Sequence, residues 1–565
     1  MSRRIPNFLL MVIFTSLSII GFSVKIKSNQ ANSNRGKNRS PNIVILVADD
    51  MGYTDLGAFG SEIPTPNIDS FAKQGRMLTN FHTLPSCSPS RSQLLTGVDN
   101  HQNGLGNMEE LLTPNQKGKP GYEGYLNNRI VTLPQLLKDA GYHTFMAGKW
   151  HLGKIPGTFP SDKGFEQSFT LLEGGGGHFN HMPFDPYSAA TYLENGKAVE
   201  LPRNFYSTVT YTSKLIEYID KNHGDGKPFF AYAAYTSPHE PLQAPQEEIS
   251  KHIDKYKKGW DRLRQERFQR MKELALIPDY LELPPRFPRV PAWDTLKPEQ
   301  QQYEAKKMAI YAASTTILDR NIGRIVEHLK QIGEYDNTIF VFLSDNSAAG
   351  DDYSEEDPQT YQAWFKKMGI NNSYENIGNA NSFVGYGQPW AQVGTTPFQW
   401  FKGKMSEGGI RVPMIVFRPG EIESKSKIDA FANSLDLTPT LLDYAGIKHP
   451  GVNYQGRPIF PLQGRSLRPL LEGKAERIYG LNEPVGMELY GVGNSALFLG
   501  DWKIVKLKQP WGNGKWHLYN LSIDPTELKD LAQMYPLQLN KMVALYEKYE
   551  QEKGVVPAKP ADRGS

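Results

Sequence analysis

The chain contains one cysteine, Cys87, among its 565 residues. A single cysteine excludes any disulfide within the chain, so the fold has to be stabilised without that cross-link. This leaves the cellular compartment open, because many exported bacterial proteins also lack disulfides. A lone cysteine is most often a small, inert residue of the core. Cys87 therefore needs further signals before it can be assigned a reactive role.

An excess of charge of one sign is also missing. Lys and Arg number 63 and Asp and Glu number 60, which gives a net charge of +3. No block of like charge exceeds a few residues, and the longest basic stretches are typical of solvated helix faces. We therefore predict no nucleic-acid partner. The length is sufficient for one large domain and a smaller one.

Long apolar runs are absent except near the N-terminus, where residues 8–20 are apolar and follow two arginines. This run is short for a membrane span, which takes about 20 residues. Residues 1–23 are therefore predicted to be a secretory signal peptide, which implies an exported protein, periplasmic or secreted. The alternative is an uncleaved membrane anchor, because the run extends weakly to Val24. Residues 24–40 are predicted to be a flexible linker.

Short apolar runs predict strands that are buried on both faces, as in a parallel sheet. The predicted strands are residues 42–48, 77–82, 144–147, 228–235, 338–343 and 414–417. Capping residues and apolar spacing predict helices at residues 65–75, 88–97, 132–141, 211–222, 304–332 and 438–446. Because strands and helices alternate, we predict a large α/β domain over residues 41–475.

The remaining segments differ from this pattern. Residues 246–300 are charged and proline-rich, and we predict an insertion with some helix. Residues 347–395 are predicted to be a long loop without periodicity, which is usually functional or disordered. Short segments broken by Gly and Asn, followed by an amphipathic helix at 537–552, predict a small antiparallel sheet with one helix. Residues 476–565 are therefore assigned to a smaller C-terminal α+β domain.

Two predicted strands stop at pairs of polar side chains. Asp49 and Asp50 follow the first strand, and Asp345 and Asn346 follow the strand at 338–343. Open α/β sheets bind their ligands at the carboxyl ends of the strands. Two adjacent carboxylates repel each other unless a cation holds them. These pairs indicate a cation site, and the alternative for each is a helix cap or a turn.

Cys87 stands directly before a predicted helix, with Ser88 as its N-cap, Pro89 as its first residue and Gly97 as its end. The free N–H groups at a helix N-terminus favour negative charge, so a thiol there becomes more acidic and an anion is attracted. Arg91 lies one turn into the helix and can direct its guanidinium at the same place.

The residues from Cys87 to Arg91, C-S-P-S-R, resemble the C-x-P-S-R signature of the type I sulfatases, which depend on formylglycine. The other blocks of that family follow the same order along the chain: Val47–Gly52, Gly148–Gly153, Thr236–His239, Leu343–Asn346 and Lys402–Pro413. The resemblance runs from about residue 41 to the C-terminal sheet and is closest to the bacterial arylsulfatases, including residues 118–124. It implies an alkaline-phosphatase-like fold, in which helices flank a large mixed, mostly parallel sheet.

The resemblance also implies a cofactor and a set of site residues. Cys87 would be converted to formylglycine (3-oxoalanine) by a formylglycine-generating or sulfatase-maturating enzyme. The catalytic positions of the family fall on Cys87, Arg91, Lys149, His151, His239 and Lys402. One Ca²⁺ ion would be held by Asp49, Asp50, Asp345, Asn346 and the converted Cys87. The aspartate and asparagine side chains offer the hard oxygen ligands that Ca²⁺ prefers.

The roles of these residues follow from the same resemblance. One hydroxyl of the hydrated aldehyde attacks sulfur while His239 or Lys402 protonates the leaving oxygen. His151 then deprotonates the second hydroxyl, which expels sulfate. Lys402 is preferred to Lys404 because it stands five residues before Glu407, as the family's lysine does before its glutamate. His178 and His181 have no match in the family's pattern, so they either reach the site or stiffen a glycine-rich loop.

The function implied is a sulfuric ester hydrolase that cleaves a small sulfate monoester, with an aryl sulfate as the expected substrate. Two alternatives stay open: a phosphonate or phosphodiester hydrolase of the same fold, and a catalytically inactive, calcium-dependent binding protein. A membrane is a partner only if the N-terminal segment is uncleaved. The aromatic residues between Tyr353 and Trp390 are expected to form a wall or lid over an apolar leaving group, or alternatively to pack the loop onto the domain.

Overall fold

The structure, a computed structural model, describes residues 39–350, 358–422, 427–489 and 494–559. The predicted signal peptide and nearly all of the predicted linker lie outside these residues. In the described part of the chain, no helix combines the length and the apolar character needed to cross a bilayer.

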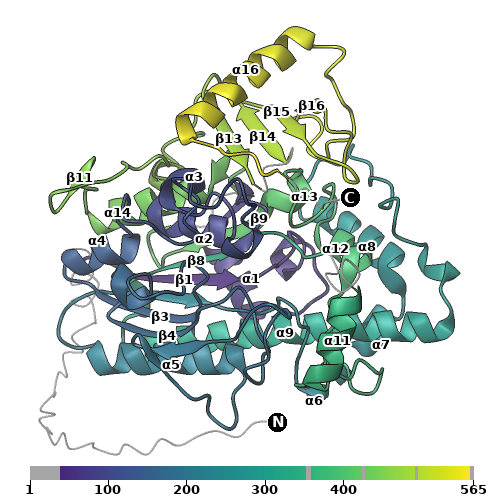
Figure 1. Ribbon diagram of the computed structural model, residues 1–565, viewed down its shortest axis with the longest axis horizontal. Helices are drawn as coiled ribbons and strands as arrows, with labels where there is room; N and C mark the ends of the chain where they lie inside the picture. The colour runs from purple at the N-terminus through teal and green to yellow at the C-terminus, as the bar shows by residue number, and fades with distance from the viewer. Residues whose placement is uncertain (1–38, 351–357, 423–426, 490–493, 560–565) are drawn as a thin grey trace, which may run out of the picture. The chain divides into compact units, whose positions relative to one another are not determined.

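A ten-stranded mixed sheet lies at the centre of the described chain (Figure 1). Its strands are β1 (Asn42–Ala48), β2 (Arg76–His82), β3 (His143–Lys149), β4 (Gln167–Leu171), β5 (Tyr192–Glu194), β6 (Lys197–Ala198), β7 (Phe229–Ala234), β8 (Thr338–Ser344), β9 (Arg411–Phe417) and β10 (Ala432–Asn433). They follow the order β10-β2-β9-β8-β1-β7-β3-β4-β5-β6. The central strands β8, β1, β7, β3 and β4 are parallel, whereas β9 is antiparallel to both β8 and β2.

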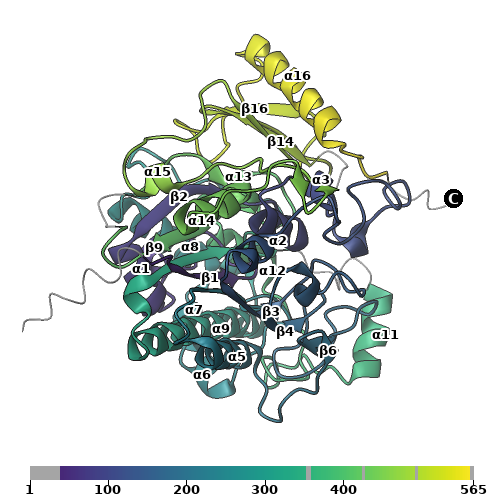
Figure 2. The ribbon, with the colours of Figure 1, turned by 90° about the vertical axis from the view of Figure 1, so that its left-hand side faces the viewer.

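Helices cover both faces of this sheet. The helices of the described residues are α1 (Pro66–Gln74), α2 (Cys87–Thr96), α3 (Asn100–Asn103), α4 (Leu133–Asp139), α5 (Ser207–Asn222), α6 (Gln246–Ser250), α7 (Ile253–Tyr256), α8 (Gly259–Glu273), α9 (Pro298–Gln331), α11 (Pro358–Met368), α12 (Gly387–Gly394), α13 (Glu407–Ile410), α14 (Leu437–Ala445), α15 (Arg468–Leu471) and α16 (Pro536–Lys553). Side chains along β1 alternate between two cores. One core packs against α2, α4 and α14, and the other against α1, α5 and α9 (Figures 1 and 2). Burial on both faces explains why β1 is apolar throughout.

A second sheet is built from β13 (Pro484–Glu488), β14 (Ser495–Leu499), β15 (Trp502–Lys506) and β16 (Trp516–Asn520), which are antiparallel neighbours in that order. One face packs on α16, which lies across it in both views (Figures 1 and 2). The other face contacts Leu84, Met405 and Ile410 of the larger sheet's loops. A short hairpin of β11 (Asn453–Tyr454) and β12 (Arg457–Pro458) lies outside both sheets. The predicted fold class is therefore confirmed.

Two local predictions are wrong. The helix after the cysteine begins at Cys87 itself, and Ser86, in extended conformation, is its N-cap, so Ser88 lies inside the first turn. Residues 347–395 are not a structureless loop, because they contain α11 and α12. In α11, Tyr361, Trp364 and Phe365 recur at helical spacing, a pattern that the surrounding Gly and Asn residues obscure.

Candidate active site

The carboxyl ends of three neighbouring strands bring distant polar residues together. Val47 of β1 pairs with Ala234 of β7 and with Leu343 of β8, so these strands end at the same edge of the sheet. Beyond that edge, the Asp345 N–H donates to Ala48 O at 3.1 Å and the Asp49 N–H donates to Ser237 O at 3.0 Å. The backbone thus aligns the polar segments that follow each strand.

Cys87 lies at the centre of this cluster and is buried. As the first residue of α2, it presents its thiol where the helix has free N–H groups. Its Sγ lies 3.5 Å from Asp49 Oδ1 and 3.5 Å from the Lys402 ammonium. Burial raises the pKa of the thiol, but the charges of Lys149 and Lys402 have the larger combined effect and hold it well below its ordinary value.

Three buried cations surround the carboxylates. Lys149 donates to Asp49 at 2.8 and 3.0 Å, and the Arg91 Nε donates to Asp345 at 2.7 Å. Lys402 donates to Asp50 at 2.8 Å. In the Lys402–Pro413 block, it is therefore Lys402 that reaches the cluster, whereas the Lys404 ammonium lies over the rings of Phe401 and Trp511. Each buried cation is thus paired with a carboxylate of the cluster beside Cys87.

The predicted ligand residues fit a hard divalent cation. Asp49, Asp50, Cys87 and His239 each offer one ligand atom, and these atoms lie within 4.8 Å of one another. Asp345 is not in this group, since it pairs with Arg91, but its Oδ1 lies 3.4 Å from the Asp50 N–H. Asn346 Oδ1 is buried and has no hydrogen-bond partner among the described residues, which would be costly unless another group contacts it. Carboxylate and amide oxygens are the ligands that Ca²⁺ prefers.

Two histidines, His239 and His151, flank the cluster, and each lies beside a carboxylate. Burial lowers the pKa of His239, but the carboxylates of Asp50 and Asp49 outweigh it and raise the pKa to about 9. Its Nε2 lies 3.4 Å from Asp50 Oδ2. His151 Nε2 lies 3.0 Å from Glu110, whose charge raises the pKa of this imidazole despite burial. Both imidazoles therefore hold a proton more readily than a free histidine does.

Backbone strain accompanies two of these residues. Asp50 and His151 adopt left-handed conformations, with φ of 62° and 54°. Such a conformation costs a non-glycine residue on the order of 1–3 kcal/mol and persists only where surrounding contacts enforce it. Hydrogen bonds from the His151 N–H to Leu172 O and from the Met51 N–H to the Ser344 hydroxyl fix these turns.

The glycine-rich loop at 174–177 forms a close wall of the site. A Cβ on Gly174 would lie 2.7 Å from the His151 ring, and one on Gly175 would lie 3.1 Å from Phe184 and 3.3 Å from His239. Glycine is therefore required at Gly174 for the loop to approach this closely. The sequence alone did not predict that this loop lies beside His151 and His239.

The two unassigned histidines have different environments. His178 is buried, with its Nδ1 2.7 Å from the Ser207 hydroxyl and its Nε2 3.0 Å from His239 O, so it supports the backbone of His239. Burial lowers the pKa of His178 to about 4, which keeps it neutral. His181 is exposed and contacts Ala190 O.

Two further supporting residues had no signal in the sequence. Glu110 is the partner of His151, and it stands in a stretch without any recognisable motif. Asn494, directly before β14, bridges the backbone next to Lys402: its amide accepts from the Met405 N–H at 2.8 Å and donates to Gly403 O at 2.7 Å. Only the tertiary structure brings residues so far apart in sequence into contact.

The aromatic residues of the segment 353–390 do not line the cluster directly. Trp390 packs with Trp260 and Trp293, and Tyr386 stacks on Tyr311, as the packing alternative expected. A second group, Tyr361, Trp364, Phe365 and Phe383, packs against Phe184. The Phe184 ring lies 4.9 Å from that of His239, so this group supports an apolar wall from behind. Tyr353 lies outside the described residues.

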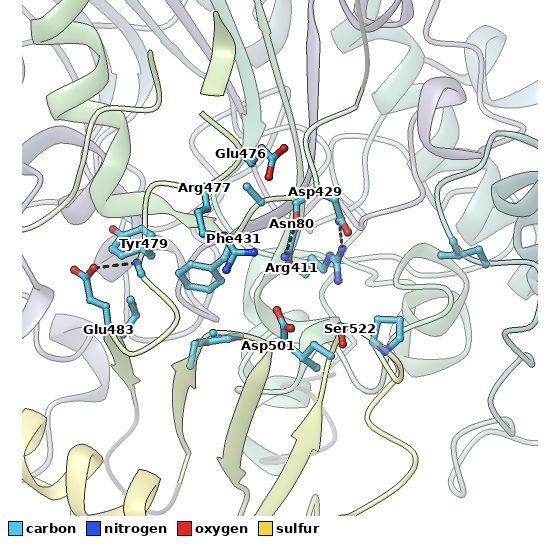
Figure 3. Close-up of a pocket in the computed structure, with 18 of the residues that line it drawn as sticks. Asn80, Arg411, Asp429, Phe431, Glu476, Arg477, Tyr479, Glu483, Asp501 and Ser522 are labelled. Atoms are coloured by element: carbon cyan, nitrogen blue, oxygen red, sulfur yellow. Dashed lines mark hydrogen bonds and ion pairs between the residues drawn. The ribbon is translucent and has the colours of Figure 1, made fainter. Parts of the chain in front are cut away.

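Two cavities lie near these elements. A cavity of about 90 Å³ opens over Ser88 and His151 and is bordered by Phe184. A larger one, of about 410 Å³, lies between the β2 and β9 edge and the C-terminal sheet (Figure 3). Figure 3 shows Arg411 paired with Asp429, beside Phe431 and Tyr479. None of the Cys87 cluster lines this larger cavity, so the smaller one is the candidate substrate entrance.

The ten-stranded sheet with helices on both faces, together with the small antiparallel sheet, defines an alkaline-phosphatase-like fold. The family described as "Sulfatase" matches residues 41–447, and the family described as "N-sulphoglucosamine sulphohydrolase, C-terminal" matches residues 397–551. The chain therefore belongs to the sulfatase family.

Known proteins agree with this assignment. An uncharacterized sulfatase of Schizosaccharomyces pombe is 41% identical over 547 residues, which cover 94% of this chain and 96% of the relative. An arylsulfatase of Klebsiella aerogenes is 40% identical over 441 residues, which cover 77% of this chain and 92% of the relative. The solved structure titled "Ps i-CgsB in complex with k-i-k-neocarrahexaose" has a TM-score of 0.64 at 25% identity, covering 93% of this chain and 96% of that one.

Proposed function

We propose that this sulfatase hydrolyses aryl sulfates, with Cys87 converted to formylglycine and one Ca²⁺ ion bound beside it. The observation that carries the proposal is the position of the only cysteine: its sulfur lies within 3.5 Å of both a buried carboxylate and a buried ammonium. An inert core cysteine would have apolar neighbours instead. The 40% identity to a bacterial arylsulfatase supports the aryl substrate class.

Formylglycine and the bound cation would each supply a defined chemistry to the reaction. The hydrated aldehyde of formylglycine would supply two hydroxyls, one to attack sulfur and one to release sulfate. The cation, held by Asp49, Asp50, Asp345 and Asn346, would supply positive charge against the sulfate oxygens. Arg91, Lys149 and Lys402 add to that charge in a site from which water is largely excluded.

The histidines would move the protons. His239, whose Nε2 lies 3.4 Å from Asp50 Oδ2, or Lys402 would donate a proton to the leaving oxygen. His151 Nδ1 has no hydrogen-bond partner in the described chain, whereas Nε2 contacts Glu110. Nδ1 is therefore the atom that would accept the proton of the second hydroxyl. General acid–base catalysis of this kind contributes about 10²–10⁴-fold to a rate.

Mass spectrometry of the peptide that contains Cys87 tests this proposal. We expect the mass decrease that accompanies replacement of the thiol by an aldehyde, and we expect Cys87→Ala to fold but to be inactive. An active preparation in which Cys87 is entirely unmodified would refute the proposal. Rates on an aryl sulfate and an aryl phosphodiester, measured together, decide between the sulfatase and the phosphodiesterase alternatives.

Two further parts of the proposal concern the maturation of the protein and its export. The conversion of Cys87 requires a maturating enzyme as a partner. Export to the periplasm or the medium is proposed on the apolar run at residues 8–20, with a membrane contact only if that segment is retained. N-terminal sequencing of the protein purified from its natural source tests this, since a mature chain that begins at Met1 would contradict cleavage.

A further inference from the structure

The entrance cavity is bordered by more carboxylates than cations. Four carboxylates border the cavity, Glu109, Glu110, Glu173 and Asp185, and we call them the acidic rim. The cations on the same border are Lys154 and His151. The wall between them is apolar or lacks side chains, with Phe184, Leu172 and the glycines of the 174–177 loop.

The two cations of the border are already paired within the rim. Lys154 lies 2.7 Å from Glu109, and His151 lies 3.0 Å from Glu110. Glu173 accepts from the N–H and hydroxyl of Thr191, at 2.7 and 2.8 Å, and Asp185 accepts from the Tyr187 N–H at 2.7 Å. Neither Glu173 nor Asp185 forms a close ion pair with a described residue, although the charge of Lys154 acts on Glu173 as well as on Glu109. Four carboxylates and two cations therefore leave the mouth with an excess of negative charge.

The size of the cavity determines what part of a substrate meets the rim. Its volume is about 90 Å³, whereas an engineered protein cavity of about 150 Å³ holds one benzene molecule. The cavity therefore encloses no more than part of one ring against Phe184. Any substituent on a larger leaving group has to project past Glu109, Glu173 and Asp185.

We propose that the acidic rim selects sulfate monoesters whose leaving group is neutral or cationic, and rejects leaving groups that carry a second anion. This inference rests on the proposed function, because it assumes that the sulfate group binds beside Cys87. An additional sulfate or carboxylate at the mouth would face unpaired carboxylates in a partly dehydrated place, where repulsion exceeds that in bulk water. We expect a loss on the order of tenfold in kcat/KM for each added anion.

A cationic substituent on the leaving group is expected to be attracted to the acidic rim. An ammonium group on the leaving group can pair with Asp185, which forms no ion pair with a described residue. Because Asp185 is half-buried, the gain depends on ionic strength and decreases as salt is added. A neutral hydroxylated substituent is expected to lie between the two charged ones.

The test compares three phenyl sulfates that carry an aminomethyl, a hydroxymethyl or a carboxymethyl substituent on the ring. In the wild type, kcat/KM is expected to fall in that order at low salt, with the differences compressed at high salt. In the double variant Glu109→Gln, Asp185→Asn, the order is expected to flatten, chiefly through a gain for the carboxymethyl substrate. The hydroxymethyl substrate is the neutral reference in each enzyme, so the inference is tested on the ratios of kcat/KM and not on the absolute turnover of the variant.

A matched control removes a carboxylate elsewhere: Glu547→Gln, on the exposed side of α16, should leave the order of the three substrates unchanged. Equal wild-type kcat/KM for all three substrates, or a double variant that keeps the wild-type ratios, would overturn the inference. So would a preference for polysulfated oligosaccharides. If the double variant fails to fold, Asp185→Asn alone serves, with half or less of the effect.

Binding measurements separate failure of the rim from failure of the proposed function. Calorimetric titration of the three intact sulfates into Cys87→Ala, which cannot turn them over, measures discrimination without chemistry. The same order of affinities supports the rim even if the wild type hydrolyses none of the three, an outcome that would refute the aryl sulfate assignment only. Equal affinities of the three sulfates for Cys87→Ala would refute selection by the acidic rim, even if the wild type hydrolyses them fast.

Discussion

Replacement of Lys503 by methionine should destabilise the protein strongly. Lys503 of β15 is fully buried and its ammonium lies 2.8 Å from Glu407 and 2.7 Å from Glu527. Both carboxylates are buried as well, and the Glu527 side chain also accepts from the Glu407 N–H at 2.7 Å. Methionine keeps the length of the side chain but leaves two buried carboxylates without their shared cation.

The size of the loss in unfolding free energy depends on which cations remain near Glu407 and Glu527 after Lys503 is replaced. Breaking a buried ion pair by removing one partner costs about 3–5 kcal/mol. Glu407 keeps His82 at 3.0 Å and Arg411 at 3.5 Å, whereas Glu527 keeps no second cation among the described residues. We therefore expect the free energy of unfolding to fall by about 3 kcal/mol near pH 6, at the lower end of that range.

The loss should increase with pH. Burial raises the pKa of Glu527 above its ordinary value, even though Lys503 lowers it, so removal of Lys503 raises it further. A carboxyl whose pKa is higher in the folded state binds more protons there than in the unfolded chain, so stability falls as pH rises toward the folded pKa. Lys503→Met should therefore lose more stability at pH 8 than at pH 6, toward about 5 kcal/mol.

Urea unfolding followed by tryptophan fluorescence at the two pH values measures this effect. Lys506→Met is the matched control, since it lies on the same strand and its ammonium contacts only the Trp516 ring at 4.7 Å in the described chain. It should cost less than about 1 kcal/mol. Equal losses for the two variants at pH 8 would refute the reasoning, because they would mean that the buried carboxylates do not depend on Lys503.

Three other changes test separate parts of the structure. Addition of a calcium chelator should lower the melting temperature of the wild type but not that of Asp345→Asn, and an unchanged wild-type melting temperature would contradict the cation site. His178→Phe should lower kcat by about tenfold or more, because the support of the His239 backbone is lost, and should also lower the melting temperature, because the Ser207 hydroxyl and His239 O each lose a buried hydrogen-bond partner; an unaltered kcat would leave His178 with a packing role only. Burial raises the pKa of Asp436 to about 7, so wild-type stability should fall as pH rises from about 4 to 7, and Asp436→Asn should remove about 4 kcal/mol of that dependence in urea titrations; parallel pH profiles would disprove the shift.

The parts of the site that were predictable lie at the ends of strands and helices. Asp49, Asp50, Asp345 and Asn346 follow apolar runs directly, and a parallel sheet requires such runs to end at one edge. Cys87 was placed beside a helix N-terminus from local residue preferences alone. The helix start was off by two residues, because Ser86, Ser88 and Ser90 are all acceptable caps and only tertiary contacts select Ser86.

The parts that were not predictable depend on contacts between segments far apart in the chain. The partner of His151, Glu110, and the support of His239, His178, have no local pattern, because a hydrogen bond across a fold leaves no periodicity. The aromatic segment was misjudged for a related reason. Its density of rings suggested a lid, but among the described residues Trp390 packs in a core cluster, and Phe184, from another segment, contacts the ring of His239.

The C-terminal sheet is best regarded as part of the active site. Asn494 fixes the backbone on the C-terminal side of Lys402, while Lys503 fixes Glu407, which opens α13 five residues after it. Near these two attachments, Met405 and Ile410 pack on the same face of the sheet as Leu84, three residues before Cys87. The lysine and the cysteine of the cluster are therefore positioned by one common surface. Loosening that surface should disturb the distance between Lys402 and Cys87 before it disturbs the larger sheet, because the strand ends that carry the carboxylates have their own hydrogen-bonded ladder.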